Sequence, residues 1–308
     1  MPSSSANLRG IVMMVAASGC FAVNDACSKF LLPHMPLSEL LALRGVVAGG
    51  LLLALIALRG EIGGIRFALQ RNVMGRAGIE TVSALLYVSA LAYITLADAS
   101  AIQQAAPMFT TAIAVTVFGT RVGWQRWLAV AAGFAGVLLV IKPGAGSFQP
   151  VALVMLGCAL LVAIRDFVTG SIPVRVPTLV VTLVTAGVSA LAGFALAGAQ
   201  EWRALEGTTM LLLGLSGLAL VIGHMSAIAA FRGTAPDVVS PFRYSNVLFA
   251  VVLGLALFGQ MLDGLSLVGV ALVIGAGLYS LHQEWAHRPA GSRDSAVHNL
   301  PALAKSKV

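Results

Sequence analysis

The chain has 308 residues, of which 58% are hydrophobic and only 10% are charged, and its mean hydropathy is +0.93. About a quarter of the residues of a soluble domain are charged, so this chain could not cover a water-facing surface, and the composition excludes a soluble class. The formal net charge of +7 does not indicate a nucleic-acid partner, because the basic residues are scattered along the chain.

The apolar residues fall in runs of about 20, the length that a helix needs to cross the hydrocarbon core of a bilayer. We therefore predict an all-α integral membrane protein with ten transmembrane helices. The predicted spans, in chain order, are 9–31, 38–58, 73–94, 99–118, 124–141, 151–170, 178–198, 209–231, 236–258 and 265–283. The tail 284–308 is polar, and we expect it to be disordered and cytoplasmic.

The loops between these spans differ in basic charge. One side of the membrane would hold Lys142 and Arg203. The side of the N-terminus would hold Arg9, Arg59, Arg66, Arg71, Arg76, Arg121, Arg126, Arg175, Arg232, Arg288, Arg293, Lys305 and Lys307. The positive-inside rule then places both termini in the cytoplasm. Cys20, Cys27 and Cys158 all lie within spans, which favours packing over a disulfide framework or a metal site.

Two pairs of similar motifs indicate an internal repeat. Phe118-Gly119 and Phe258-Gly259 each end an apolar run, and "AVND" (22–25) resembles "AIRD" (163–166) at almost the same spacing. We predict a first five-helix repeat over 1–144 and a second over 150–283. An odd number of spans inverts the second repeat in the membrane, as in many secondary transporters. Chance similarity between Gly- and Ala-rich helices is the alternative.

Several stretches carry a family resemblance. They are the "ND…K" of the first span, "LxxLRGxxA" from Leu40 to Ala48 and the hairpin "FG…WLAVAAGFAGVLL". With the five-plus-five plan, they resemble the drug/metabolite transporter superfamily, specifically its EamA-like branch, over about residues 9–283. The resemblance implies a bacterial inner-membrane carrier of small metabolites such as amino acids, amines, nucleotide-like compounds or riboflavin. The chain departs from the family's usual "FGE", reading "FGT" and "FGQ", which puts a loop contact in doubt.

Ionisable residues inside a bilayer are costly unless they pair or face water, so each is a functional candidate. Asp25 and Lys29 are four residues apart on one face of the first span and could pair. With Arg44 they would form an outer polar cluster. The alternative is that Lys29 extends to the membrane interface and Arg44 joins helices.

A second cluster is predicted toward the cytoplasm, from Glu80, Arg165, Asp166, His224 and Arg243. In the second repeat, Asp166 occupies the position that Asp25 occupies in the first. Two gates related by inversion would contain such a pair of carboxylates. The gate candidates are Lys29, Arg165 and Asp166. The alternative for Arg165 and Asp166 is an ordinary juxtamembrane loop with Arg175.

Neutral polar groups between the clusters suit a binding chamber. The substrate-binding candidates are Asn24, Asp25, Arg44, Tyr87, Gln103, Gln104, Arg243, Tyr244 and Asn246. The alternative for the last three is an interfacial anchor. Pro107, within the fourth span, is a candidate kink. The proton-coupling candidates are Asp25, Glu80 and His224, although a lone histidine in an apolar span is more often a packing residue.

We therefore predict a secondary active transporter for a small polar or zwitterionic metabolite, such as an amino acid, amine or flavin-like compound. Alternating access would be proton-coupled or by exchange. The expected partners are this substrate and the lipid bilayer, with no cofactor and no metal. A homodimer is not required, although Gly45 and Gly49 form a step of small residues suited to helix contacts. HExxH, GxSxG and Walker motifs are absent from the sequence, which argues against an enzyme. A passive channel and a structural membrane subunit are the alternatives.

Overall fold

The computed structural model describes residues 4–117, 119, 123–142, 150–173, 175–199, 201–203, 205–233 and 239–286, and all regular elements within these ranges are helical. The eleven α-helices are α1 (Ser4–Leu31), α2 (Leu37–Leu58), α3 (Arg71–Leu91), α4 (Leu96–Gln103), α5 (Ala106–Thr116), α6 (Trp124–Ile141), α7 (Val151–Gly170), α8 (Thr178–Leu196), α9 (Gly207–Gly233), α11 (Ser245–Phe258) and α12 (Gly264–Ala286). Short 3₁₀ helices are η1 (Ile62–Phe67), η2 (Ala197–Ala199) and η3 (Ser240–Tyr244). Phe118 of the repeat motif and residues 287–308 of the predicted tail lie outside the described residues.

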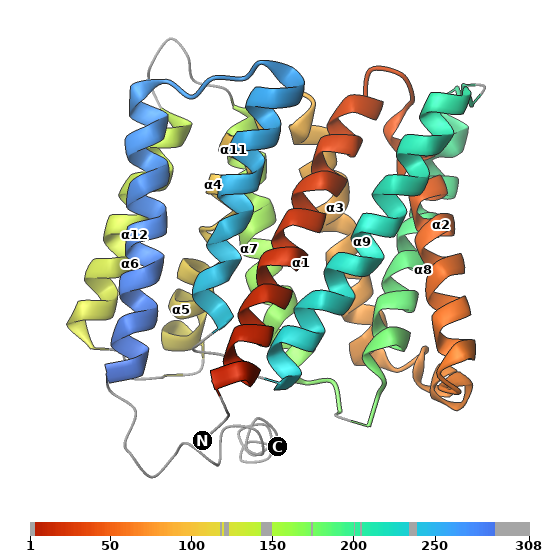
Figure 1. Ribbon diagram of the computed structural model, residues 1–308, viewed down its shortest axis with the longest axis horizontal. Coiled ribbons are helices and arrows are strands. Elements are labelled where there is room, and N and C mark those ends of the chain that lie inside the picture. Colours follow the sequence, from red (N-terminus) through yellow and green to blue (C-terminus); the bar gives the residue numbers. More distant parts are fainter. Residues whose placement is uncertain are drawn as a thin grey trace.

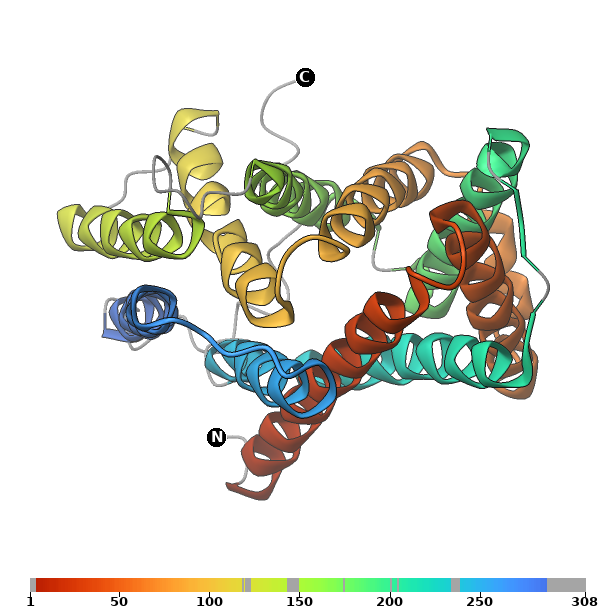
Figure 2. The same ribbon diagram turned by 90° about the horizontal axis from the view of Figure 1, so that it is seen from above.

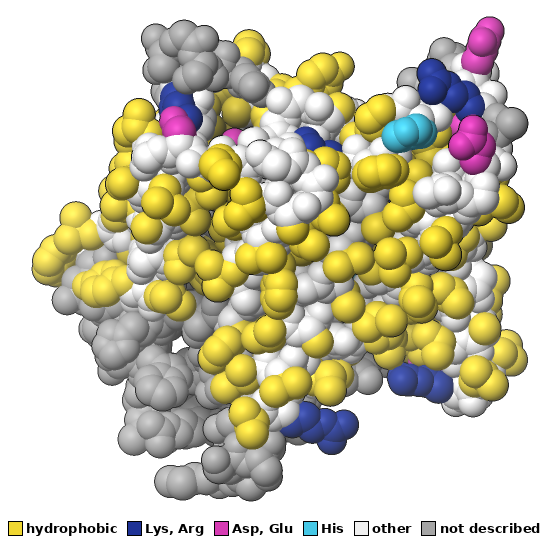
Figure 3. Space-filling model, turned by 45° about the horizontal axis from the view of Figure 1, so that its top comes forward, with side chains coloured by type: hydrophobic (Ala, Val, Ile, Leu, Met, Phe, Trp, Pro, Cys, Tyr) yellow, Lys and Arg dark blue, Asp and Glu magenta, His cyan; other side chains and the backbone are white. Residues whose placement is uncertain are grey.

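Five of these helices are long and apolar enough to cross a membrane by length and composition, and they are Leu8–Leu31, Leu37–Leu58, Val151–Gly170, Thr178–Leu196 and Gly207–Ala230. Shorter apolar helices follow at Trp127–Ile141, Phe242–Phe258 and Gly264–Tyr279. On the face in Figure 3, hydrophobic side chains cover the middle, and charged side chains gather near the upper and lower edges. This distribution fits a multi-pass membrane protein.

The predicted fourth span, 99–118, is not one continuous helix. It is divided into α4 and α5, which are separated by a break at Gln104 and Ala105. Pro107 occupies the first turn of α5. Proline has no backbone N–H, and its ring would collide with the carbonyl of residue 103 in a continuous helix. The candidate kink at Pro107 is therefore a full break between two helices within the predicted span.

Apart from α4 and α5, which follow one another in the same direction, successive α-helices run alternately up and down, so the bundle has two distinct ends (Figure 1). We call the end where α1 begins and α12 ends the lower end, and the opposite end, where α1 and α6 end, the upper end. The connections from α2 to α3 and from α7 to α8 lie at the lower end, whereas α11 and α12 are joined at the upper end.

Helices from the two halves of the chain pack against one another in matched pairs. α2 packs on α8, α6 on α12 and α4 on α11. The contact of α1 with α9 has a counterpart in α3 with α7, and that of α2 with α9 has one in α3 with α8. α1 also contacts α11, while α7 contacts α4 and α5. Figure 2 shows α6 beside α12 and α1 crossing α9.

Glycines allow the closest of these approaches. A Cβ atom on Gly136 of α6 would lie 2.8 Å from the carbonyl oxygen of Gly269 of α12, and one on Gly269 would lie 2.6 Å from that of Gly136. On α2, a Cβ atom at Gly45 would lie 2.8 Å from the carbonyl oxygen of Ala186 in α8. The expected role of Gly45 in a helix contact is confirmed. Gly49 has nothing within 4 Å of such an atom and takes no part in it.

Candidate functional site

Asp25 lies in the upper part of α1 and is held by neutral donors. Its Oδ2 atom accepts a hydrogen bond of 2.8 Å from the hydroxyl of Tyr87 in α3. Its Oδ1 atom accepts one of 3.0 Å from the side-chain amide of Asn24. Among the described residues, no ion pair within 4.0 Å involves this carboxylate. Sequence reasoning placed these three residues in one site, and the structure brings them into contact.

The amide of Asn24 extends this network to α9. Ser216, which is fully buried, donates a hydrogen bond of 2.9 Å from its hydroxyl to Asn24 Oδ1. Ser28 donates one of 2.8 Å to the backbone carbonyl of Asn24. Because Asn24 is only 6% exposed, each of its polar atoms needs a partner within the protein. We refer to Asn24, Asp25, Tyr87 and Ser216 as the Asp25 network.

Arg44 of α2 lies beside the network and does not bond to the Asp25 carboxylate directly. Its guanidinium donates a hydrogen bond of 3.3 Å to the hydroxyl of Ser28, and the residue is 7% exposed. It interacts electrostatically with both Asp25 and Glu80. Arg44 therefore interacts with one carboxylate of each predicted cluster.

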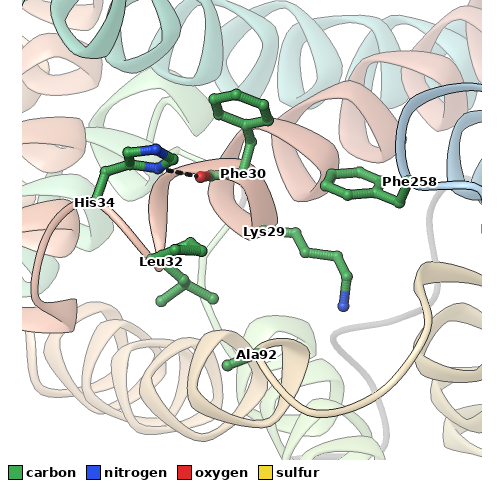
Figure 4. Close-up of a pocket in the computed structure, with 7 residues that line it drawn as sticks. Lys29, Phe30, Leu32, His34, Ala92 and Phe258 are labelled. Carbon is green, nitrogen blue, oxygen red and sulfur yellow. Dashed lines mark hydrogen bonds between the residues drawn. The ribbon is translucent and has the colours of Figure 1, made fainter.

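Lys29 does not form the expected ion pair with Asp25. Its ammonium donates to the carbonyl oxygens of Leu91, at 2.6 Å, and of Ile94, at 2.5 Å. These carbonyls lie at and just beyond the end of α3, where carbonyl oxygens lack intrahelical partners and carry the negative end of the helix dipole. The long side chain reaches across the space beside Ala92 (Figure 4). The expected ion pair with Asp25 is therefore not formed.

The predicted lower cluster is assembled as an ion-pair network. Arg165 of α7 donates one hydrogen bond of 2.6 Å to the Glu80 carboxylate of α3 and one of 2.7 Å to Asp166. We call these three residues the Arg165 cluster. The alternative prediction placed Arg165 and Asp166 in a juxtamembrane loop with Arg175. Arg175 instead lies over the ring of Phe67, 5.8 Å from its centroid.

Arg76, which sequence reasoning did not assign to a site, flanks this cluster. Its guanidinium donates hydrogen bonds to the hydroxyls of Thr169, at 3.1 Å, and Thr185, at 2.7 Å. It also interacts electrostatically with Glu80. The cluster with Arg76 thus contains equal numbers of acidic and basic side chains.

His224 of α9 has features of both of its alternative roles. Its ring meets the edge of Phe21 in α1, with 5.2 Å between the centroids and planes at 73°. This is a packing contact. His224 also interacts electrostatically with Glu80 and Arg165, so a change in its charge would be felt by the Arg165 cluster.

The three candidates around η3 lie in different surroundings. Asn246 donates a hydrogen bond of 3.1 Å to the carbonyl oxygen of Ser18 and accepts one of 2.6 Å from Ser100, so it connects α11 to α1 and α4. Tyr244 is 7% exposed and packs so closely on Gly277 of α12 that no Cβ atom would fit there. Arg243 is exposed. The structure does not bring these residues together with the Asp25 network.

Gln103 and Gln104 lie at the break between α4 and α5. Both side chains are half-buried. The Oε1 atom of Gln103 is buried and has no hydrogen-bond partner among the described residues. An unpaired buried acceptor is costly, so Gln103 remains a binding candidate.

Asp98 was missed, although the sequence held a signal for it. Its backbone N–H donates to the Thr95 hydroxyl at 3.0 Å, capping α4, while its Oδ1 atom is buried without a hydrogen-bond partner in the described part of the chain. The pattern Thr95-x-x-Asp98 recurs as Thr234-x-x-Asp237, at nearly the spacing of the other repeated motifs. The second copy lies outside the described residues.

Comparison with known proteins agrees with this arrangement. The profile of the EamA-like transporter family matches residues 8–142. The resemblance that the sequence motifs carried is thereby confirmed, and the relatives below extend it to most of the chain.

Three characterised relatives illustrate the range of EamA-like proteins. The chain is 23% identical over 287 residues to an S-adenosylmethionine uptake transporter of Rickettsia prowazekii, covering 90% of this chain and 94% of that protein. It is 28% identical over 224 residues to a riboflavin transporter of Rhizobium johnstonii, covering 70% of each. It is 25% identical over 280 residues to the pseudopaline exporter CntI of Pseudomonas aeruginosa, covering 87% of this chain and 94% of the exporter.

One solved crystal structure shares the fold, with a TM-score of 0.65 at 20% identity over 93% of this chain and 99% of the other. The relatives are transporters, so the similarity supports a membrane transporter and favours transport over catalysis.

Proposed function

We propose that this chain is a secondary active transporter that carries a small polar or zwitterionic metabolite across the bacterial inner membrane by alternating access. Amino acids, amines and flavin-like compounds are the substrate classes. The observation that carries the proposal is the matched set of contacts between the two halves of the chain. The names of the relatives add S-adenosylmethionine, riboflavin and pseudopaline as compounds that EamA-like proteins move.

The contacts support two inverted repeats, 1–144 and 150–283. A two-fold axis in the membrane plane would map α1 onto α7 and α3 onto α9. The contact of α1 with α9 then becomes that of α7 with α3, which is present. The pairs α2 with α8 and α6 with α12 map onto themselves. Inverted repeats of this kind provide two equivalent gates around a site near the middle of the bilayer.

The orientation follows from the charges at the two ends. The lower end carries the connection with Arg59 and Arg66, as well as Arg175. By the positive-inside rule, the lower end and both termini are cytoplasmic. The upper end, with Lys142 and Arg203, would then face the periplasm.

In the transport cycle, the Asp25 network and the Arg165 cluster act at different depths. Asp25 carries a carboxylate whose hydrogen-bond donors are neutral, which suits it to receive a proton or a cationic group of the substrate. Arg44 interacts with the carboxylates on both sides and is placed to respond to either. The Arg165 cluster holds its two carboxylates in ion pairs with one guanidinium, which suits a gate that opens when those pairs separate.

The test is counterflow in proteoliposomes containing the purified full-length protein. Vesicles loaded with an unlabelled compound should accumulate the same compound in labelled form, with saturation. The panel comprises L-phenylalanine, S-adenosylmethionine, riboflavin and spermidine. Asp25→Asn should lower the rate at least tenfold, whereas Glu201→Gln, at an exposed carboxylate, should leave it unchanged. Linear flux without counterflow would indicate a channel, and no flux of any panel member would overturn the proposed substrate classes.

A further inference from the structure

Two adjoining pockets open at the upper end of the bundle, and neither includes a residue of the Asp25 network. The charged pocket has a volume of about 420 Å³ and is lined by Lys29, Thr95, Asp98, Lys142 and Gln260 among others. The apolar pocket has a volume of about 380 Å³, and its lining includes Phe30, Leu32, His34 and Phe258. Lys29 and Ala92 line both pockets. Each volume falls within the range of about 300–1,000 Å³ that is usual for small-molecule sites.

The charged pocket contains a carboxylate oxygen that lacks a donor. Asp98 Oδ1 is buried and accepts no hydrogen bond from the described residues. The carboxylate of Asp263, at the same end of the bundle, differs from that of Asp98. It accepts hydrogen bonds from the Lys142 ammonium at 2.6 Å and from the backbone N–H of Ser266 at 3.0 Å. Lys142 is therefore engaged by Asp263. The Asp98 carboxylate has hydrogen bonds with the side chains of Thr95 and Ser266 and interacts electrostatically with Lys142, and its Oδ1 atom is left as an acceptor for a cationic group.

The same pocket contains an ammonium with a donor to spare. A lysine ammonium has three N–H donors, and Lys29 uses two of them on the carbonyl oxygens of Leu91 and Ile94. These two contacts fix the position of the ammonium without neutralising it by a carboxylate. Lys29 interacts electrostatically with Asp98, so the two charges lie close enough to bind one small ligand together.

Figure 4 shows how the two pockets meet. The Lys29 side chain runs between the apolar pocket and the space beyond it, and Phe258 lies on the opposite side from His34 and Leu32. An apolar group attached to a ligand held by Lys29 would extend into this lining. A free carboxylate acceptor, a fixed ammonium donor and an adjoining apolar pocket together match one chemical class.

We propose that this pair of pockets is a docking site for an α-amino acid with an apolar side chain. The amino group of the ligand binds Asp98, its carboxylate binds Lys29, and its side chain occupies the apolar pocket. The inference deepens the proposed function, on which it rests, by assigning a substrate class to a site at the upper end.

The experiment is calorimetric titration of the full-length protein in detergent with three probes. L-phenylalanine has both charged groups, phenethylamine has only the ammonium and 3-phenylpropionate has only the carboxylate. We expect L-phenylalanine to bind at least tenfold more tightly than either analogue, because each charge-assisted hydrogen bond contributes about a factor of ten or more.

The variants distinguish the two ends of the ligand. Asp98→Asn should weaken L-phenylalanine and phenethylamine at least tenfold and leave 3-phenylpropionate unchanged. Lys29→Met should weaken L-phenylalanine and 3-phenylpropionate and leave phenethylamine unchanged. Glu201→Gln and Arg59→Gln, which change exposed residues outside both pockets, are the matched controls and should alter none of the affinities.

Failure of this site can be separated from failure of the transporter. Absence of L-phenylalanine binding, or equal weakening of all three probes by Asp98→Asn, would overturn the docking site. If the same protein still shows counterflow of another panel compound, the proposal of a transporter stands without the docking site. L-phenylalanine binding with the expected variant pattern but no counterflow of any compound would support the site and contradict transport.

Discussion

The Asp25 network and the Arg165 cluster share one helix but stabilise their carboxylates by different means. Tyr87 of α3 belongs to the Asp25 network, and Glu80, seven residues earlier on the same helix, belongs to the Arg165 cluster. Asp25 accepts hydrogen bonds from a phenol and an amide, whereas Glu80 accepts one from a guanidinium at 2.6 Å. The Asp25 carboxylate can thus change its charge without breaking an ion pair, and the Glu80 carboxylate cannot.

This contrast assigns different parts of a transport cycle to the two regions. A pair such as Glu80 with Arg165 resists any change that removes one partner, because the other charge would remain in a poorly solvated place. A carboxylate bonded to neutral groups responds more easily to a proton or to a cationic ligand. We therefore expect the upper region to sense the substrate and the lower region to hold a conformation.

The largest effect is expected from breaking the lower pair. Arg165→Met leaves the partly buried Glu80 carboxylate without its guanidinium, and loss of one partner of such a pair costs about 3 kcal/mol. Thermal unfolding in detergent should show a clear fall in melting temperature. Asp166→Asn keeps the bond between Arg165 and Glu80 and serves as the control, with a much smaller fall.

The double variant Glu80→Gln with Arg165→Met makes this result specific. Neutralising both partners should restore much of the melting temperature, since the carboxylate that remains without Arg165, that of Asp166, is 40% exposed and therefore better solvated than that of Glu80. If the double variant is as unstable as Arg165→Met alone, the ion pair is not the source of the effect, and the distinction between the two regions fails.

An intermediate effect is expected in the upper region. Tyr87→Phe removes one hydrogen bond from Asp25 and preserves the ring, which corresponds to about 1–2 kcal/mol. The counterflow rate should fall roughly tenfold while the melting temperature changes little. Tyr279→Phe is the matched control, because Tyr279 of α12 is 43% exposed, lines neither pocket and should show no change in rate. A fall in melting temperature as large as that of Arg165→Met would contradict the assignment of a sensing role.

Helix positions could be predicted from the sequence because hydrophobic run length determines them. Two predicted spans are interrupted: the fourth is divided into α4 and α5, and the described part of the ninth, 239–258, contains the 3₁₀ helix η3 before α11. A hydropathy pattern does not detect such interruptions, although Pro107 marked the one in the fourth span. The charged residues of the Arg165 cluster were also found from sequence, since few ionisable groups occur within apolar runs.

The contacts between those residues were harder to predict. The spacing of Asp25 and Lys29 permits a pair, but the open carbonyls at the end of α3 compete for the ammonium, and they come from a helix more than sixty residues away. Ser216 was missed because a serine in an apolar span has no distinguishing pattern, and only its contact with Asn24 identifies it. Asp98 could have been found by extending the search for repeated motifs to capping residues.

The smallest effect is expected at the pair of Lys142 and Asp263, because the Asp263 side chain is 53% exposed, whereas that of Glu80 in the lower pair is 22% exposed. The hydrogen bond from Lys142 lowers the pKa of the Asp263 carboxyl from 3.8 to about 2. Because the pKa is lower in the folded state, the pair stabilises the protein above about pH 4, and this contribution disappears as the pH falls toward 2. Asp263→Asn should therefore lower the melting temperature slightly and equally at pH 7 and pH 5, with the difference from the parent protein shrinking at pH 3. Exposed ion pairs are screened by salt, so 1 M NaCl should also reduce the difference. A difference that vanished between pH 7 and pH 5, or that equalled the effect of Arg165→Met, would mean that burial is not what separates the Arg165 cluster from an ordinary surface pair.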